Sequence, residues 1–194
     1  TEENTLSLHD ALPISHVVLL RGVNVGKGNR IPMATFKSLL QRMGCEDVRT
    51  LLNSGNAVVS RPKVSAGTLA GEVGSAIHDT VGLDVQVVVK SSRDFGAIVA
   101  SNQLLSSSTD PSRLLVSFAQ SGPALKALAS ISSVVRAPDR FHLGAKAAYL
   151  YCPRGILVSE AAKALLGKAG RGVTTRNWAT VLKIHELLSV QMPE

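Results

Sequence analysis

The side chains with the clearest chemical potential lie in two short segments rich in glycine and asparagine. Most of them are hydrogen-bond donors, and the set comprises Arg21, Asn24, Lys27, Arg30, Asn53, Ser54 and Asn56. Glycines between them let the backbone approach a ligand closely, and loop amides can form nests that bind anions. Arginine adds a planar fork that pairs with phosphate or carboxylate through two hydrogen bonds. These segments therefore predict a site for a phosphate or carboxylate group.

The same residue types also have a purely architectural explanation. Asparagine and glycine recur in tight turns because they tolerate left-handed backbone angles, and Arg21 can simply brace a neighbouring loop. The sequence leaves both interpretations open.

A second candidate group precedes the last apolar stretch of the chain, at Thr174-Thr175-Arg176-Asn177-Trp178. We expect this group to open the final helix, where hydroxyls cap free amides and the helix dipole favours an anion. Capping alone would explain it, and the single tryptophan is expected to be an apolar anchor. If this helix folds back onto the first part of the chain, Arg176 and Asn177 would join the donor cluster.

Other chemistries find little support. The two cysteines, Cys45 and Cys152, are far apart and lack the Cys/His spacing of a metal site, so no metal is expected. The Walker and Rossmann glycine spacings are missing near Gly26, and we expect no cofactor. No histidine stands beside a spaced carboxylate pair or an obvious nucleophile, so the catalytic residues, if any, stay unknown.

The elements that must position the first donor cluster follow from apolar periodicity and turn signals. The sequence predicts a strand at 16–21, a helix at 32–43, hairpin strands at 48–52 and 57–60, a helix at 65–81 and a strand at 84–90. This is the βαββαβ order of a ferredoxin-like fold. Because its first and second strands are parallel, the loops after them should converge at one end of the sheet.

The rest of the chain is less regular. We predict helices at 92–100, 159–166 and 176–189, a short helix starting at Pro123, and strands at 114–119, 133–137, 140–143 and 147–152. The fold class is therefore α+β, with a ferredoxin-like first subdomain over 16–104. A second, smaller α+β subdomain over 105–194 ends in a closing C-terminal helix. We find no sequence repeat.

The first residues do not belong to this pattern. Residues 5–14, Thr-Leu-Ser-Leu-His-Asp-Ala-Leu-Pro-Ile, resemble the translation of a sequencing adapter, and we interpret 1–15 as an artefactual or disordered tail. His9 and Asp10 therefore carry no functional weight.

Composition narrows the class of protein. Hydrophobic residues make up 45% against 18% charged, which is typical of a globular chain. The net charge of +7 favours acidic partners such as nucleic acid or phosphorylated metabolites, although aromatics at 4% argue against a base-stacking surface. With no apolar run long enough for a membrane and no signal peptide, we expect a cytoplasmic protein without a membrane partner.

Three segments carry a family resemblance: Leu-Arg-Gly-Val-Asn-Val-Gly at 20–26, Arg-Thr-Leu-Leu-Asn-Ser-Gly-Asn at 49–56, and Thr-Arg-Asn-Trp-Ala-Thr-Val at 175–181. Together they resemble the bacterial DUF1697 family of unknown function. The resemblance implies a ferredoxin-like first half with an appended second subdomain, and it implies no established activity.

The leading hypothesis is a cofactor-free binding protein for an anionic ligand, whether nucleotide, nucleic acid or phosphorylated metabolite. One alternative is an enzyme acting on a phosphorylated or carboxylated metabolite, with Arg21 and Arg176 as anion clamps. Another is a protein-interaction module that uses a sheet face or an edge strand. The sequence does not determine the oligomeric state.

Overall fold

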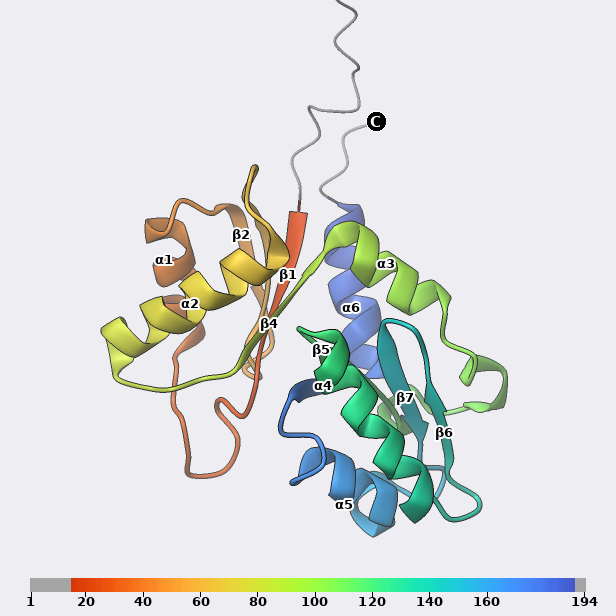
Figure 1. The fold of residues 1–194 in the computed structure, drawn as a ribbon. Coiled ribbons are helices and arrows are strands. Elements are labelled where there is room, and N and C mark those ends of the chain that lie inside the picture. The colour runs from red at the N-terminus through yellow and green to blue at the C-terminus, as the bar shows by residue number, and fades with distance from the viewer. Residues whose placement is uncertain (1–14, 191–194) are drawn as a thin grey trace, which may run out of the picture.

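The first half of the chain folds as its apolar periodicity predicts. The computed structural model describes residues 15–190, so the adapter interpretation, His9 and Asp10 lie outside the described residues. The elements in order are β1 (Ser15–Leu20), α1 (Met33–Arg42), β2 (Glu46–Leu51), β3 (Asn56–Ser60), α2 (Ala66–Val81) and β4 (Val87–Ser91). They form an antiparallel sheet in the order β2-β3-β1-β4 (Figure 1), which confirms the ferredoxin-like prediction.

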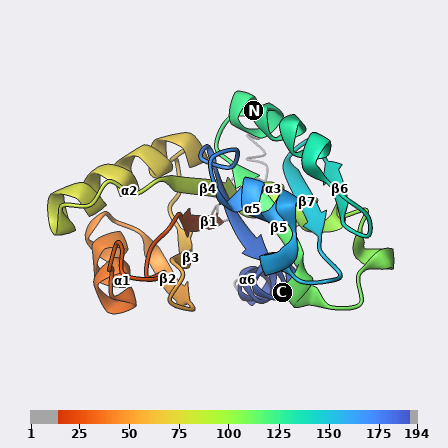
Figure 2. The same cartoon turned by 90° about the horizontal axis from the view of Figure 1, so that it is seen from below.

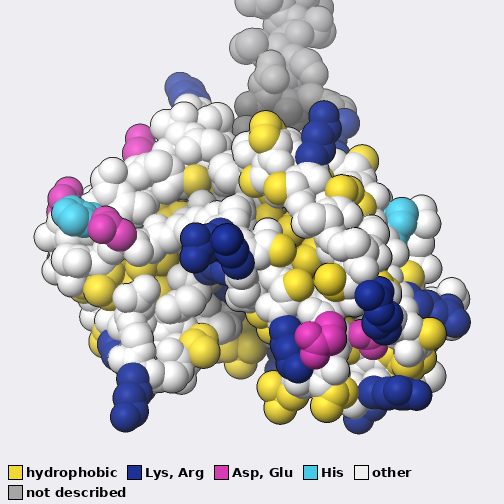
Figure 3. Space-filling model, turned by 60° about the horizontal axis from the view of Figure 1, so that its bottom comes forward, with side chains coloured by type: hydrophobic (Ala, Val, Ile, Leu, Met, Phe, Trp, Pro, Cys, Tyr) yellow, Lys and Arg dark blue, Asp and Glu magenta, His cyan; other side chains and the backbone are white. Residues whose placement is uncertain are grey.

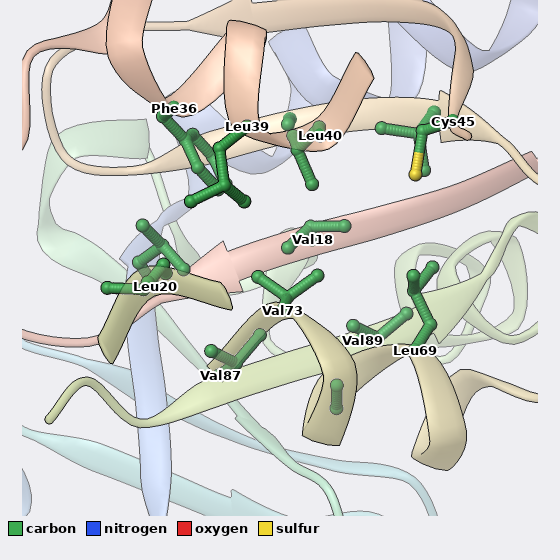
Figure 4. Packing of buried hydrophobic residues seen from close by; sticks show 14 of the residues in the cluster. Val18, Leu20, Phe36, Leu39, Leu40, Cys45, Leu69, Val73, Val87 and Val89 are labelled. Atoms are coloured by element: carbon green, nitrogen blue, oxygen red, sulfur yellow. The ribbon is translucent and has the colours of Figure 1, made fainter. Parts of the chain in front are cut away.

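Alternation along β1 builds two separate cores, because successive side chains of a strand point to opposite faces. Val18 and Leu20 pack under α1 and α2, where Figure 4 shows them facing Phe36 and Val73. Val17 and Leu19 face the second half of the molecule. The first sheet is therefore apolar on both sides.

The second half repeats the topology of the first. Its elements are β5 (Leu114–Ala119), α4 (Gly122–Lys126), the 3-10 helix η4 (Ala127–Val134), β6 (Arg140–Leu143), β7 (Ala147–Tyr151), α5 (Glu160–Leu166) and β8 (Val173–Asn177). The antiparallel order β6-β7-β5-β8 matches that of the first sheet when each half is numbered from its own start. The chain thus contains two βαββαβ units, although its sequence shows no repeat.

Two sequence predictions in this half are wrong. The strand expected at 133–137 is absent from the described chain, because η4 occupies Ala127–Val134 and irregular backbone follows it. The final helix begins at Trp178, not at Arg176, since Val173–Asn177 forms the edge strand β8. Valine and threonine favour a strand there, and Asn177 then caps the helix, which places Arg176 in the sheet.

Two helices outside both βαββαβ units lie between the sheets. They are α3 (Ser92–Ala100), which leads out of the first unit, and α6 (Trp178–Ser189), which closes the chain (Figures 1 and 2). Phe95 and Ile98 of α3 and Trp178 and Val181 of α6 share one buried cluster with the inner faces of both sheets. The layers therefore run helix, sheet, helix, sheet, helix, and both faces of each sheet are covered.

Three single-turn 3-10 helices complete the part of the chain that the structure describes: η2 (Leu105–Ser107), η3 (Pro111–Arg113) and η5 (Ile156–Val158). Within residues 15–190, no helix is both long and apolar enough to cross a membrane.

Candidate functional site

The two glycine- and asparagine-rich segments meet at one end of the first sheet, as the parallel direction of β1 and β2 predicts. The Nδ2 of Asn24 donates to the carbonyls of Asn53 and Ile31, both at 2.7 Å, and its Oδ1 accepts from the Ile31 amide at 2.9 Å. Asn24 holds a left-handed backbone with φ 55°. Arg30 donates to the Gly26 carbonyl at 2.9 Å. Arg30 therefore braces its own loop, and Asn24 also fastens that loop to the hairpin turn.

Arg176 reaches this end of the sheet from β8 and is buried there. Its Nη2 donates to the carbonyls of Leu20 at 2.6 Å and Ser54 at 3.1 Å, and its Nη1 donates to Thr174 Oγ1 at 2.8 Å. Burial lowers the pKa of Arg176 to about 10, so the side chain stays charged at neutral pH. Its Nη2 thus binds carbonyls of the first half, while its Nη1 binds Thr174 Oγ1 and the Thr175 carbonyl on its own strand.

Asn56 completes the arrangement from the first strand position after the hairpin turn. It is fully buried; its Oδ1 accepts from Nε of Arg176 at 2.6 Å, while its Nδ2 donates to the Leu51 carbonyl and to Ser54 Oγ. Asn177, on the neighbouring position of β8, caps α6 by accepting from the Thr180 amide at 2.9 Å.

Arg21 makes the reciprocal connection, from the first half to the second. Its Nη1 donates to the carbonyls of Gly170 and Val173, and its Nη2 approaches the Gly167 carbonyl at 3.5 Å. Among residues 15–190 no acceptor is bonded to its Nε–H, and the side chain is only half-buried. Burial, and secondarily the charge of Arg171, lowers the pKa of Arg21. Arg21 thus fastens the loop after α5 and keeps donors to spare.

A cleft with a volume of about 330 Å³ lies beside Arg21, between the two halves. The first half supplies Arg21, Gly22, Val23, Val25 and Ser54; the second supplies Leu165, Leu166 and the residues 173–176. Val25 and Leu166 are 66% and 50% exposed, so the mouth of the cleft has an apolar lip. Its volume falls within the usual range for small-molecule sites.

A basic loop that the sequence analysis missed borders this cleft. Residues 167–172 read Gly-Lys-Ala-Gly-Arg-Gly, and both Lys168 and Arg171 are exposed. The three glycines with two cations were a signal comparable to that of the segment around Gly26. Lys27 is also exposed, on the loop after β1. Figure 3 shows lysine and arginine side chains on both halves of this face, with apolar side chains between them.

The cleft has few groups that could perform acid–base or metal chemistry. Its lining contains no histidine, cysteine, aspartate or glutamate. Throughout the described chain, no cluster of such residues could hold a metal ion. The hydroxyls of Thr174 and Thr175 are engaged with Leu20 and Ser117, respectively. The site is therefore equipped for binding and charge pairing.

Aromatic side chains are not available at the surface for stacking on bases. Six of the seven aromatic residues are buried, namely Phe36, Phe95, Phe118, Tyr149, Tyr151 and Trp178. The seventh, Phe141, is half-buried against the outer core of the second half. Recognition of single-stranded nucleic acid by base stacking lacks its usual platform here.

Comparison with known proteins gives fold and family. The conserved bacterial protein SP0830 from Streptococcus pneumoniae has a similar structure, with a TM-score of 0.76 and 24% sequence identity over 91% of this chain and 99% of that one. At this identity the likeness establishes the fold. No curated protein matches the sequence. The sequence pattern of DUF1697, described as a protein of unknown function, matches residues 14–149 and reaches into both halves. The chain belongs to the DUF1697 family.

Proposed function

We propose that this protein binds a small anionic molecule in the cleft between its halves, with a nucleotide or another phosphorylated metabolite as the favoured class. The observation that carries the proposal is the half-buried guanidinium of Arg21, which borders a cleft of about 330 Å³ and has an Nε–H without a bonded acceptor among the described residues. Such a group pairs well with phosphate or carboxylate.

The walls of the cleft favour a ligand with an apolar part as well as a charge. Val25 and Leu166 contribute apolar surface, and the anionic group would lie toward Arg21. Lys168 and Arg171 at the border would attract it, because exposed cations raise the local concentration of anions. A nucleotide or a phosphorylated ester combines these properties.

The same features weigh against the other functions considered. A lining without histidine, carboxylate or thiol favours binding over turnover. Covered sheet faces and buried aromatics disfavour recognition of a nucleic acid strand. Under this proposal Arg176 and Asn56 hold the two walls together, and their polar atoms stay bonded to the protein.

A thermal-shift screen against nucleotides, sugar phosphates, small carboxylates and short DNA or RNA tests the proposal. A ligand present at a hundred times its dissociation constant should raise the unfolding free energy by about 2.7 kcal/mol, a shift of several degrees. Arg171→Ala and Lys168→Ala should weaken the hit, because each removes a cation from the border of the cleft. Arg93→Ala, which removes an exposed cation on α3, should not.

The outcomes separate the hypotheses. A hit that weakens steeply with added salt and extends to DNA or RNA of any sequence would replace the metabolite with nucleic acid. Consumption of the ligand during the assay would show that the protein is an enzyme acting on that ligand. Failure of every ligand class would refute the proposal and direct attention to protein partners at the edge strands β2 and β6.

A further inference from the structure

A second, smaller hollow lies between the halves near the beginning of β1, whereas the cleft lies beyond the end of that strand. Its volume is about 160 Å³, and its polar lining consists of Lys90, Asp94, Gln120, Ser121 and Lys146. Lys90 pairs with Val17 across the sheet, which fixes its place at the junction. Nothing in the proposed function uses this hollow.

Lys90 places a half-buried cation in this hollow. Along β4 the side chains alternate, so Lys90 shares the inner face with Val88 and points toward the second half. Within residues 15–190 no acceptor is bonded to its ammonium group. The nearby carboxylate of Asp94 is bonded by Lys146. Lys90 therefore keeps three N–H groups for another acceptor.

Two more side chains present donors to the same hollow. The backbone amide of Val89 donates to Oε1 of Gln120 at 2.7 Å, so the amide NH₂ of Gln120 is turned to other acceptors. The Oγ of Ser121 accepts from the Ala124 amide at 3.3 Å, which leaves its O–H to donate. An ammonium, an amide and a hydroxyl are a donor set suited to an oxyanion.

Size and charge agree with this chemistry. Two lysines against one aspartate give the hollow a net positive charge of one. Its volume of about 160 Å³ leaves room for a phosphate ion or a small carboxylate. Ile98 and Leu125 form an apolar wall that would lower the local dielectric and strengthen a charged hydrogen bond.

We propose that this hollow is a second binding site, which takes a phosphate or carboxylate group between Lys90, Gln120 and Ser121. The site binds an oxyanion too small to fill the larger cleft. Its hydrogen-bond donors come from both halves of the molecule.

The pKa shifts of Lys90 and Asp94 agree with a Lys90 charge that Asp94 balances only in part. Burial lowers the pKa of Lys90, an effect that the Asp94 carboxylate opposes and the Lys146 cation reinforces. The hydrogen bond from Lys146 is the main cause that lowers the pKa of Asp94. A bound oxyanion would compensate the charge that Lys90 keeps in a partly desolvated place.

Titration of the isotope-labelled protein with inorganic phosphate and, separately, with acetate tests the site by amide NMR. The amides of Gln120, Ser121 and Ala145 should shift in a saturable manner. Lys90→Met retains the aliphatic stem and should weaken binding about tenfold or more, the fold-change for losing a hydrogen bond to a charged group. Lys37→Met, an exposed substitution on α1, should leave the affinity unchanged.

Unfolding temperature separates a binding role from a structural one. Because Lys90 donates to no protein acceptor in the described chain, Lys90→Met should unfold at the same temperature as the wild type or at a higher one. Preference for phosphate over acetate, or the reverse, names the group that binds. Unchanged affinity in Lys90→Met, or shifts confined to amides near Gly22 and Gly170, would overturn the proposal.

Discussion

The Nε of Arg176 donates to Oδ1 of Asn56 across 2.6 Å and joins β8 of the second half to β3 of the first. The Nη2 of Arg176 also binds carbonyls of the first half, while Arg21 of the first half binds carbonyls of the second. Each βαββαβ unit thus contributes one arginine that binds backbone carbonyls of the other unit. The connection lies at the border of the proposed cleft, so it also sets the distance between the cleft walls.

Replacing Arg176 by methionine should lower the free energy of unfolding by about 3 kcal/mol or more. The substitution leaves Asn56 Oδ1 buried without its donor, and an unsatisfied buried group costs about 1 to 3 kcal/mol. It also removes the charged donor of the Leu20 carbonyl, which keeps only the Thr174 hydroxyl, and a hydrogen bond to a charged group contributes about 1.5 to 3 kcal/mol. Denaturant unfolding measures the loss. Arg93→Met, an exposed control on α3, should change stability by less than about 0.5 kcal/mol. Equal stability of the two variants would contradict the structural role of Arg176.

Replacing Arg21 by alanine should act locally, on the loop after α5. The guanidinium fastens the carbonyls of Gly170 and Val173, and hydrogen bonds to a charged group are worth about 1.5 to 3 kcal/mol when buried, with less expected for this half-buried group. Amide hydrogen exchange of residues 167–172 should accelerate while β5 and β7 keep their protection. Lys27→Ala, on the neighbouring exposed loop, should leave that exchange rate as it is.

The hairpin turn before Asn56 depends on a glycine that no other residue can replace without strain. Gly55 has φ +82°, and a Cβ there would lie 2.7 Å from Leu20 Cβ and from Val23 Cγ2. Gly55→Ala should therefore lower the free energy of unfolding by about 2 kcal/mol or more, from backbone strain and overpacking together. Gly28→Ala, where a Cβ meets nothing within 4 Å, is the matched control. A Gly55→Ala midpoint equal to that of Gly28→Ala in denaturant would refute this packing argument.

The sequence predicts the elements of the first half well because each has an unambiguous period and clear punctuation. Pro32 precedes α1, Ser65 caps α2, and Gly82 ends α2 with a left-handed backbone. The short strand β8 is not predicted in this way, because its five residues end in the helix cap Asn177 and resemble the first turn of that helix. Its role as an edge strand depends on pairing with β5, some sixty residues earlier.

The candidate site shows a comparable limit. The sequence places Arg21 and Asn56 in one donor cluster and adds Arg176 only if the last helix folds back onto the first half. The fold brings all three to one place, with Arg176 on β8. The sequence cannot reveal that most of their donors meet carbonyls and amides of the protein itself, because those partners lie up to 156 positions away. The competition between a ligand and a backbone acceptor is decided by tertiary geometry.

Tyr149 should make the protein sensitive to alkaline pH. Its hydroxyl is buried and donates to the Ile98 carbonyl at 2.6 Å, and burial raises its pKa to about 12 from 10.0. Between these two values the unfolded chain loses the proton and the folded chain retains it. The contribution of this hydroxyl to the free energy of unfolding is therefore fully present below pH 10. It falls by roughly 2 kcal/mol as the pH rises toward 12.

Comparison with Tyr149→Phe isolates this effect from the lysines that titrate in the same range. The variant should be less stable at neutral pH by about 1 kcal/mol, because it loses the hydrogen bond to Ile98. Its stability should then fall less steeply than that of the wild type between pH 10 and 12, as measured by denaturant midpoints at each pH. Parallel curves for the two proteins would mean that the Tyr149 hydroxyl ionises as freely in the folded state as in the unfolded chain.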